Sequence, residues 1–576
     1  MSLASFLIGI AGRRAAARFE KATRDPAAAQ QRKLREILTS NRDTEYGRAH
    51  RFAEVEDLHS YRKRVPIATY EQIRGHVDRM ANGEPNVLTA EAPVMFAMTS
   101  GTTGHSKLIP VTPSCRGRDH ADQIRVWLHH ARLAHPNIFD GKLVTLVSPA
   151  VAGRTPAGIP YGSTSGMMYR DMNPLVRRSY AIPYSVAEIE DYDAVYYTVM
   201  RLALACDVTL LATANPSSIQ KLVEAADACA ETLLRDIHDG TLAKDLAIET
   251  SIRKVIERRL ARDPARARAL AAARDRRQGK LLPVDYWPNL HLIACWKGGT
   301  VGGAVERFPE WFDPDGRAPV PVRDWGYLSS EARGSIPLSD EGDGGVLTVG
   351  TNVFEFVQAD ELEKSPDDPD SWRVLGVDAI EPGQQYYVFI TTTGGLYRYD
   401  INDVIEVVGR YDRTPVIAFR RKGRGMTNLT GEKLSENQVI DAFASAARAL
   451  DVSVGHFRAE PDAEETRYVF KLELETPIPE DKHAALLEQI DDTLRETNLE
   501  YKAKRESGRL HAPLLQVMKP GWHEAELKQS AAGGKPVFQS KDVHLDAKQE
   551  FVPEPENVEA EVELDEPATP ECPRER

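Results

Sequence analysis

The feature that most constrains the fold is a strand signal followed directly by a turn signal and a helix signal in the middle of the chain. Residues 207–213 read DVTLLAT, an apolar run with the length of a buried strand. The sequence NPSS at 215–218 supplies a helix start, and apolar residues recur at helical spacing over 219–237. Similar units at 94–134 and 142–204 predict an α/β fold with a mainly parallel sheet, whose active site lies at the carboxyl ends of the strands.

Later segments predict a second, smaller domain. The pattern turns β-rich from about residue 345, and a basic, glycine-containing stretch at 421–425 has the chemistry of a hinge. We therefore expect a large N-terminal domain with mixed and parallel sheets at 1–420 and a small α+β domain at 426–545. The small domain is predicted from a helix, a strand and a second helix at 434–450, 467–475 and 482–497. Residues 546–576 are rich in Glu and Pro and are expected to be a disordered tail.

Charge and cysteine usage exclude several classes of protein. A formal net charge of -13 argues against a general nucleic-acid surface, although it leaves room for a local basic pocket. The five cysteines form no C-x-x-C pair, which suits a cytoplasmic enzyme rather than a zinc or disulfide protein. The apolar run at 3–10 precedes its arginines, so it predicts an amphipathic helix and not a secretory signal or membrane span. We expect a monomer or a weak dimer.

The stretch TSGTTGHSK at residues 99–107 is the first candidate for binding chemistry. Glycines let a backbone approach a ligand closely, and N–H groups, hydroxyls and the lysine can then surround a polyphosphate. The stretch does not match the Walker A pattern. On composition alone, a flexible polar surface loop is an equally good interpretation. The candidate phosphate ligands are Thr99, Ser100, Gly101, Thr102, Thr103, Gly104 and Lys107.

Two later stretches add polar groups that a nucleotide needs. In WGYLSSEARG at 325–334, Tyr327 can stack on a base and Glu331 can hold Mg²⁺, which prefers oxygen ligands. In GGLYRYDINDV at 394–404, an aspartate can accept hydrogen bonds from ribose hydroxyls, and Asp400 competes with Asp403 for this role. Taken alone, the first stretch is better explained as an ordinary turn with a solvated glutamate, and the second can also be a loop that carries a carboxylate.

Together and in this order, the three stretches resemble the adenylate-forming superfamily and, more closely, the auxin-responsive acyl-acid amido synthetases of the Gretchen Hagen family. That family has a hydroxyl-rich loop followed by Pro-Val, matched at 99–111, and a Y-x-S-S-E motif, matched at 327–331. Its G-L-Y-R-Y-R-V-G-D-V motif is matched at 395–404, with Asp400 where the plant proteins have arginine and Asn402 where they have glycine. Asparagine holds a glycine-type backbone less easily, although it tolerates a positive φ, so these departures concern the shape of the loop more than the role of Asp403. The shorter matches are VPIATYE at 65–71, WPN at 287–289 and FEF at 354–356.

The resemblance implies roles for individual residues. Lys107, Glu331 and Lys433 would be catalytic, and Glu331 would bind Mg²⁺. A glycine loop at Gly298 and Gly299 would pack against adenine. The remaining ATP or AMP contacts that the resemblance implies are Tyr327, Ser329, Ser330, Asp403 and Arg421.

The resemblance also implies an activity. The chain is expected to adenylate a carboxylic acid at the α-phosphate of ATP, which gives an acyl-adenylate and pyrophosphate. It is then expected to join the acyl group to the amine of an amino acid. An acyl- or aryl-CoA ligase, which shares the first step, and a nucleotide-binding regulator without turnover remain open. The acyl pocket is expected within 120–180 and 296–330, and the segment at 161–170 is either part of it or a core-packing turn.

Overall fold

A computed structural model describes residues 3–99, 107–298, 303–366, 368–523, 525, 544–546, 551 and 553–564. The chain forms two compact units, of which the first ends at Arg420 and the second begins at Arg421. Within the described ranges, no helix combines the length and the apolar character that a membrane span requires.

A four-stranded parallel sheet lies at the centre of the first unit's α/β layer, as the alternating strand and helix signals predict. Its order is β3-β6-β7-β8, with bounds Lys142–Thr145, Val208–Ala212, Leu292–Ala294 and Val322–Arg323. Neighbouring residues of β6 enter different cores, because side chains alternate along a strand. Leu211 packs in a core with helices α9 to α11, whereas Leu210 packs in a core with α1 and α6. Helices therefore cover both faces of the sheet.

The predicted start signal caps α10 (Pro216–Ala228), because the Asn215 side chain accepts a hydrogen bond from the Ser217 backbone N–H. The predicted helix over 219–237 is instead two helices, because the chain leaves helical geometry at Cys229, which has φ −99° and ψ 19°. The helices that follow α8 (Pro174–Arg177) in this layer are α9 (Tyr192–Ala203), α10 (Pro216–Ala228), α11 (Ala230–Asp239), α12 (Thr250–Glu257), α13 (Pro264–Arg276), α14 (Pro283–Tyr286), α15 (Gly303–Glu306) and α16 (Phe308–Phe312).

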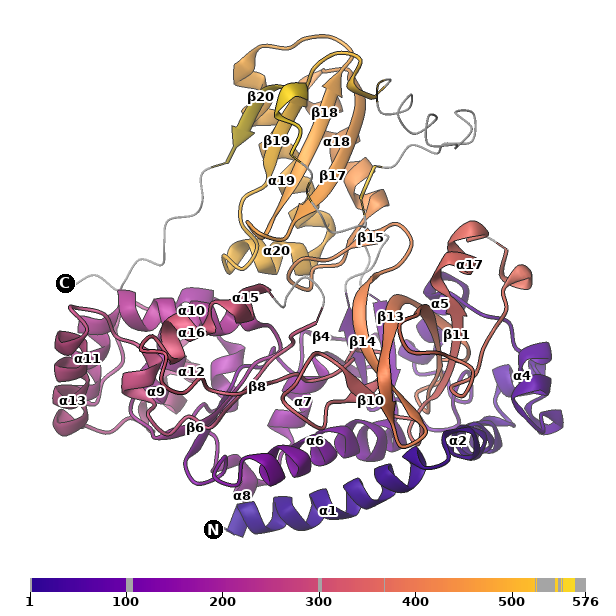
Figure 1. Cartoon of the computed structure of the whole chain (residues 1–576), viewed down its shortest axis with the longest axis horizontal. Coiled ribbons are helices and arrows are strands. Elements are labelled where there is room, and N and C mark those ends of the chain that lie inside the picture. The colour runs from indigo at the N-terminus through magenta and orange to yellow at the C-terminus, as the bar shows by residue number, and fades with distance from the viewer. Residues whose placement is uncertain are drawn as a thin grey trace. The chain divides into compact units, whose positions relative to one another are not determined.

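The amphipathic helix predicted at the N-terminus is α1 (Leu3–Thr23), which lies alongside α6 (Ala121–Ala134) (Figure 1). Arg18 of α1 forms a 2.6 Å ion pair with Asp122 of α6. A Cβ at Gly12 would lie 3.1 Å from the backbone oxygen of Arg125, so the two helices approach closely at this point.

A six-stranded antiparallel sheet forms the other half of the first unit. Its order is β11-β12-β13-β14-β10-β9, with bounds Val353–Gln358, Gln385–Thr391, Tyr399–Tyr411, Thr414–Lys422, Gly345–Leu347 and Ser335–Ile336. The N-terminal helices pack against this sheet in one core: α2 (Pro26–Asn41), α3 (Glu45–Ala49), α4 (Leu58–Arg64) and α5 (Tyr70–Ala81). Helix α17 (Ala359–Lys364) follows β11. Two residues of the predicted hinge, Arg421 and Lys422, end strand β14.

A short mixed sheet carries the first binding motif. Strand β1 (Met95–Thr99) pairs antiparallel with β2 (Lys107–Val111) and parallel with β5 (Pro160–Gly162), which pairs with β4 (Gly153–Arg154). A second strand therefore separates the loop from the helix predicted after it. That helix begins near Thr112-Pro113, with a π-helical turn over Cys115–His120 that continues into α6.

The second unit is α+β, as predicted. Its main sheet is β17-β18-β19-β20, with bounds Val454–Asp462, Arg467–Leu474, Leu514–Met518 and Val558–Glu563. Its helices are α18 (Glu436–Leu450), α19 (Glu480–Thr497) and α20 (Leu499–Glu506), and β15 (Met426–Thr427) pairs with β16 (Leu434–Ser435).

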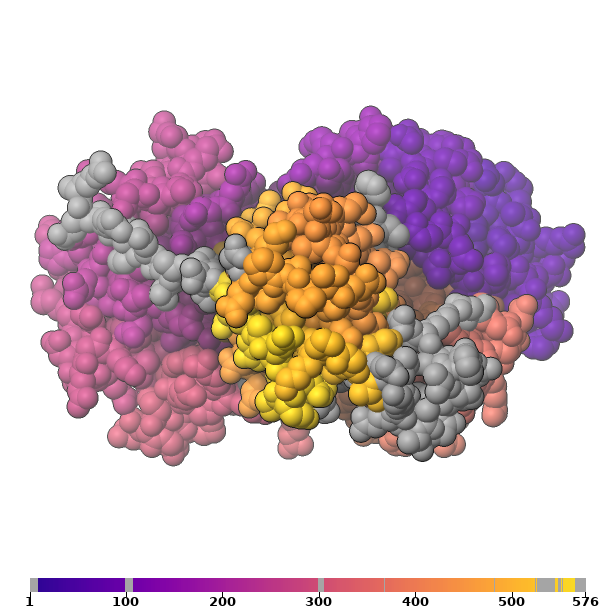
Figure 2. All heavy atoms as spheres, turned by 90° about the horizontal axis from the view of Figure 1, so that it is seen from above, coloured from indigo at the N-terminus to yellow at the C-terminus, as the bar shows by residue number. Residues whose placement is uncertain are grey.

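Strand β20 corrects the expectation that residues 546–576 are a disordered tail. It pairs antiparallel with β19, and its residues pack against the rest of the second unit, as the yellow and orange atoms of Figure 2 show. Ala560 and Val562 contact the apolar core, while the intervening glutamates are exposed. The high content of Glu and Pro hides this two-residue alternation, which is that of a half-buried strand.

Candidate functional site

The first motif connects the two strands of a hairpin. Thr99, the last residue of β1, pairs in register with Lys107, the first residue of β2. The predicted phosphate ligands Ser100, Gly101, Thr102, Thr103 and Gly104 lie outside the described residues, as does Gly299. The Lys107 ammonium lies 5.6 Å from the centre of the Tyr70 ring, and the Tyr70 hydroxyl accepts a 2.8 Å hydrogen bond from the Leu108 backbone N–H. Tyr70, at the start of α5, therefore fixes the exit of the loop.

The second motif is a tight hairpin that presents Glu331. Leu328 and Arg333 form an antiparallel bridge, and the Ser329 N–H donates to the Ala332 carbonyl oxygen at 2.9 Å. Glu331, next to the partly buried Ser330, is at the turn and is only 8% exposed. Burial raises the pKa of the Tyr399 phenol, and the negative charge of the nearby Glu331 carboxylate raises this pKa further. The turn thus holds Glu331 in the protein and not in bulk water.

The second and third motifs meet through one hydrogen bond. The Tyr327 hydroxyl donates to the Asp403 carboxylate at 2.6 Å, and both side chains are buried. Burial and the neighbouring Asp403 charge raise the pKa of Tyr327, so this phenol stays protonated as a donor. The Tyr327 ring is also parallel to that of Phe419, with centroids 6.3 Å apart. Tyr327 therefore both supplies a flat apolar wall and orients Asp403.

The geometry assigns different partners to the two aspartates that compete for the ribose. The Asp400 carboxylate accepts a 2.9 Å hydrogen bond from the backbone N–H of Asn402 within its own turn, whereas Asp403 contacts the second motif. Asn402 has φ +57°, the left-handed conformation that asparagine tolerates in place of the family's glycine.

The glycine loop after β7 is held by a residue that the sequence analysis did not select. The Asp324 carboxylate, at the end of β8, accepts hydrogen bonds from the backbone N–H groups of Lys297 and Gly326. Burial raises the pKa of Asp324 to about 6, although these N–H donors act against the shift. A Cβ at Gly298 would lie 3.4 Å from the Phe419 carbonyl oxygen, so the glycine permits close packing there. The position of Asp324 directly after a parallel strand was the signal available in the sequence.

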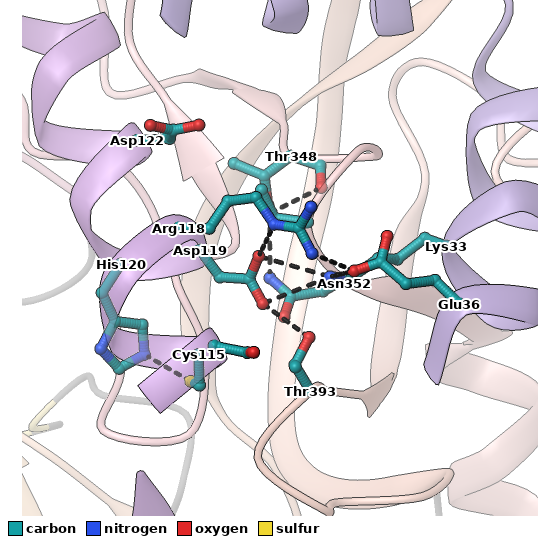
Figure 3. A network of polar contacts seen from close by, with 12 residues as sticks. Lys33, Glu36, Cys115, Arg118, Asp119, His120, Asp122, Thr348, Asn352 and Thr393 are labelled. Carbon is teal, nitrogen blue, oxygen red and sulfur yellow. Dashed lines mark hydrogen bonds and ion pairs between the residues drawn. The ribbon is translucent and has the colours of Figure 1, made fainter. Parts of the chain in front are cut away.

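A buried polar network supports the helix that follows the first motif (Figure 3). The Lys33 ammonium lies 3.3 Å from the Asp119 carboxylate, which also accepts a 2.7 Å hydrogen bond from Thr393. Asp119 therefore links α2 and the π-helical turn to the loop that precedes the third motif. In the same turn, the Cys115 thiol lies 3.4 Å from the His120 ring. Burial raises the pKa of Cys115 to about 12 and lowers that of His120 to about 3, so this pair is neutral and structural.

A second buried network fixes the start of the third motif. The Glu355 carboxylate accepts hydrogen bonds from Arg398 at 2.9 Å and from Arg62 at 2.7 Å. Glu355 is 1% exposed. Of its two partners, Arg398 directly precedes β13 and Arg62 lies in α4. Sequence reasoning noted the FEF match but gave Glu355 no role. Its position in a strand of apolar residues was the available signal, because buried carboxylates are paired.

The segment at 161–170 contributes mainly to packing. Met167 and Tyr169 of α7 (Thr164–Arg170) are 3% and 4% exposed, and the Tyr169 hydroxyl donates to the Ile182 carbonyl oxygen. These two side chains therefore favour the interpretation of a core-packing turn over that of an acyl pocket.

Arg421 and Lys433, the two predicted site residues beyond residue 420, belong to the second unit. Lys433 has φ +54° and its backbone N–H is 3.4 Å from the Asn428 side chain. The neighbouring Glu432 is fully buried and accepts hydrogen bonds from the backbone N–H groups of Leu429 and Thr430. This compact turn holds Lys433 on the surface of the unit's fold. The predicted residues that the structure brings together are those of the first unit.

Magnesium prefers oxygen ligands, and Glu331 is the residue to which the resemblance assigns this role. Glu331 supplies one carboxylate, and the described residues contain no cluster of three His, Cys, Asp or Glu side chains suited to a metal. Mg²⁺ commonly binds one or two carboxylates together with substrate phosphates, so a lone glutamate fits this mode.

Comparison with known proteins gives the chain its family. The GH3 family N-terminal domain matches residues 15–316, the central domain matches 345–422 and the C-terminal domain matches 437–550. The probable indole-3-acetic acid-amido synthetase GH3.12 of Oryza sativa subsp. japonica is 26% identical, over 91% of this chain and 92% of that protein. The indole-3-acetic acid-amido synthetase GH3.15 of Arabidopsis thaliana is 24% identical, over 88% of each.

The solved structures add agreement in fold. AtGH3.15 acyl acid amido synthetase in complex with 2,4-DB has a TM-score of 0.62 at 20% identity, over 96% of this chain and 97% of that chain. A further GH3.15 acyl acid amido synthetase structure has a TM-score of 0.61, over 94% of this chain. Because the N-terminal domain alone matches residues 15–316, more than half of the 576 residues, this chain belongs to the GH3 family.

Proposed function

We propose that the chain is an ATP-dependent acyl-acid amido synthetase, an AMP-forming ligase of a carboxylic acid and an amino acid. The observation that carries this proposal is the 2.6 Å hydrogen bond between Tyr327 and Asp403. It places the second and third motifs in one buried corner, with Glu331 on the same hairpin as Tyr327. The names of the related proteins, which are amido synthetases, support the same activity.

In the proposed first step, a carboxylate oxygen of the acid attacks the α-phosphorus of ATP. The bond from that phosphorus to the bridging oxygen breaks, and the electron pair leaves with pyrophosphate. Asp403 would accept hydrogen bonds from the ribose, and the wall formed by Tyr327 would contact the base. Lys107 would stabilise negative charge that builds on the phosphates, as a fixed cation does in a site that excludes water.

Glu331 is the proposed ligand of Mg²⁺, which would supply positive charge against the phosphates. The fit rests on its oxygen donor chemistry and on its position in the turn, where it is 8% exposed. A carboxylate held in this way needs no rearrangement when the metal and nucleotide bind, and such preorganisation favours catalysis.

In the proposed second step, the amine nitrogen of an amino acid attacks the carbonyl carbon of the acyl-adenylate. AMP leaves with the electron pair of the broken bond, and the nitrogen loses a proton to give the amide. Lys433 would contact the phosphate, and Arg421 the ribose. The stretch 421–425 would act as the hinge between the two half-reactions, a motion of a well-known type.

We further propose a cytoplasmic enzyme that works as a monomer or a weak dimer. Four cysteines within the described residues are free, which suits a reducing compartment.

The test is to supply ATP, magnesium and a panel of aryl, indole and fatty acids with either a mixture of amino acids or coenzyme A. We expect acid-dependent AMP formation and an amide, both detected by mass spectrometry. A thioester with coenzyme A and no amide would identify an acyl-CoA ligase instead. ATP binding without AMP formation from any acid would support a regulator.

A further inference from the structure

Arg333 is a cation of the Glu331 hairpin to which no role has been given. Its guanidinium donates to the Ser329 carbonyl oxygen at 2.7 Å and to the Thr164 hydroxyl at 2.9 Å. Thr164 is the first residue of α7, so Arg333 joins the hairpin to the start of that helix. The residue is partly buried and keeps some exposure to solvent.

Arg333 differs from other cations of the first unit in its charge partners. Lys33, Arg323 and Arg398 form ion pairs with Asp119, Asp340 and Glu355 respectively. Among the residues that the structure describes, by contrast, no carboxylate lies within ion-pair distance of the Arg333 guanidinium.

Partial burial of a guanidinium without a charged partner costs desolvation free energy. Two of the five N–H groups of the guanidinium are bound to neutral oxygens. A partly desolvated guanidinium binds an incoming carboxylate or phosphate more strongly than an exposed one does, because the surroundings screen the charges less.

We propose that Arg333 binds a substrate carboxylate that ATP does not activate. The proposal rests on the function proposed above. The carboxylate that attacks ATP loses its charge as the acyl-adenylate forms, so an ion pair to it would favour the ground state over the transition state and slow the step. A carboxylate that keeps its charge throughout both steps has no such disadvantage. Two sources fit this chemistry: a second carboxylate on the acyl acid, or the α-carboxylate of the amino acid.

The test compares Arg333→Gln with wild-type enzyme in two assays. The first is pyrophosphate exchange without an amine, with pairs of acids that differ only in a second carboxylate. The second is amide formation with an amino acid or with its carboxamide, which lacks the carboxylate. Arg333→Lys, which keeps a charge but not the bidentate geometry, should retain part of the preference and guards against a folding defect.

The expected result is a fall of tenfold or more in the preference for the carboxylate-bearing substrate, measured as a ratio of kcat/KM values. A fall in the exchange assay alone identifies the acyl acid as the source, and a fall in the amide assay alone identifies the amino acid. Two ratios that both stay within twofold of wild type would overturn the proposal. A rise in the KM for ATP as the only change would also overturn it, because it would assign Arg333 to a phosphate.

Thr164→Val is the matched control for a purely mechanical role. It removes one hydrogen bond of Arg333 and leaves the charge, so it should change neither ratio by more than twofold. If it reproduces the effect of Arg333→Gln, Arg333 only supports the local structure through its hydrogen bonds, and the proposal is wrong. Should wild-type enzyme show no acid-dependent exchange, the proposed function fails separately. Calorimetric binding of the same carboxylates to wild type and Arg333→Gln would then decide, and equal or absent binding would contradict the carboxylate site.

Discussion

Two regions of the first unit bury carboxylates and bind them in different ways. In the framework region, defined by Glu355 and Asp119, the carboxylates are bound by arginine or lysine, with Arg398 2.9 Å from Glu355 and Lys33 3.3 Å from Asp119. In the nucleotide region, Asp403 accepts a hydrogen bond from a phenol. Asp324, in the same region, accepts from two backbone N–H groups.

This difference separates support from ligand binding. A cation next to a buried carboxylate cancels its charge, and the pair then ties together segments far apart in the chain. A phenol or a backbone N–H orients a carboxylate without adding a charge of its own, which suits a group that we propose to bind a ribose hydroxyl. We therefore expect substitutions in the framework region to lower stability and substitutions in the nucleotide region to lower ATP affinity.

The largest effect is expected for Glu355→Gln. The substitution removes the charge shared by Arg398 and Arg62 while keeping the size of the side chain, and leaving a buried cation unpaired lowers the free energy of unfolding by about 3–5 kcal/mol. Chemical denaturation checks this value. Glu71→Gln breaks the exposed pair with Arg74, and it should change stability by less than about 1 kcal/mol. Equal effects of the two variants would contradict the supporting role given to the buried Glu355.

Asp403→Asn should raise the KM for ATP strongly and change stability little, which is the opposite of the effect expected for Glu355→Gln. Loss of a charged acceptor for the ribose corresponds to about 1.5–3 kcal/mol, or roughly a 10- to 100-fold rise in the KM for ATP. The free energy of unfolding should change by less than about 1.5 kcal/mol, because the Tyr327 hydroxyl can still donate to the amide oxygen. Asp400→Asn is the matched control and should leave the KM nearly unchanged. A larger effect at Asp400 would exchange the roles of the two aspartates.

The pH dependence sharpens the account of Asp324. Its pKa is raised to about 6, so it becomes protonated in the folded protein as the pH falls below that value. The protonated oxygen is a weaker acceptor, so the hydrogen bond from the backbone N–H of Lys297 or of Gly326 weakens. We expect the KM for ATP to rise about tenfold between pH 7 and pH 5 in wild type, relative to Asp324→Asn, in which one oxygen is replaced at every pH. A constant ratio between the two enzymes across this range would refute the assignment.

The same group affects stability with the opposite sign. Because its pKa is higher in the folded protein than the ordinary 3.8, the folded state binds more protons between pH 4 and pH 6. Its contribution to stability therefore falls as the pH rises through this window. Denaturation of wild type and Asp324→Asn at pH 4.5 and pH 7 checks the direction.

The smallest effect is expected for Tyr327→Phe. The ring and its contact with Phe419 are kept, and only the hydrogen bond to Asp403 is lost, which corresponds to about 0.5–1.5 kcal/mol. The KM for ATP should rise roughly 2- to 10-fold, as steady-state kinetics would show. A loss as large as that of Asp403→Asn would mean that Tyr327 contributes more than orientation.

The sequence predicted the fold class because local patterns carried it. Alternating strand and helix signals indicated the parallel sheet, and NPSS at 215–218 marked the start of α10. Strand β20 was missed because its composition resembles that of a disordered tail, while its partner β19 is about 40 residues distant in the chain. Pairing between distant segments is not encoded in local composition.

The sequence likewise predicted some residues of the site and missed others. Glu331 and Asp403 stand in recognisable motifs, and the structure places their motifs together through Tyr327. Asp324 and Glu355 stand in ordinary surroundings in the sequence, and their importance depends on partners such as Lys297 or Arg398 that only folding brings near them. Sequence motifs mark the groups that face a ligand more readily than those that hold them.

The central claim is that the motifs of the first unit form one site for adenylation. Carboxylate-dependent exchange of labelled pyrophosphate into ATP tests it most directly, with Glu331→Gln as the matched variant. We predict exchange that requires an acid and falls at least about 100-fold in Glu331→Gln, since a fixed electrostatic group contributes an effect of this size. Undiminished exchange in Glu331→Gln, or no exchange with any acid in protein that binds ATP, would contradict the account.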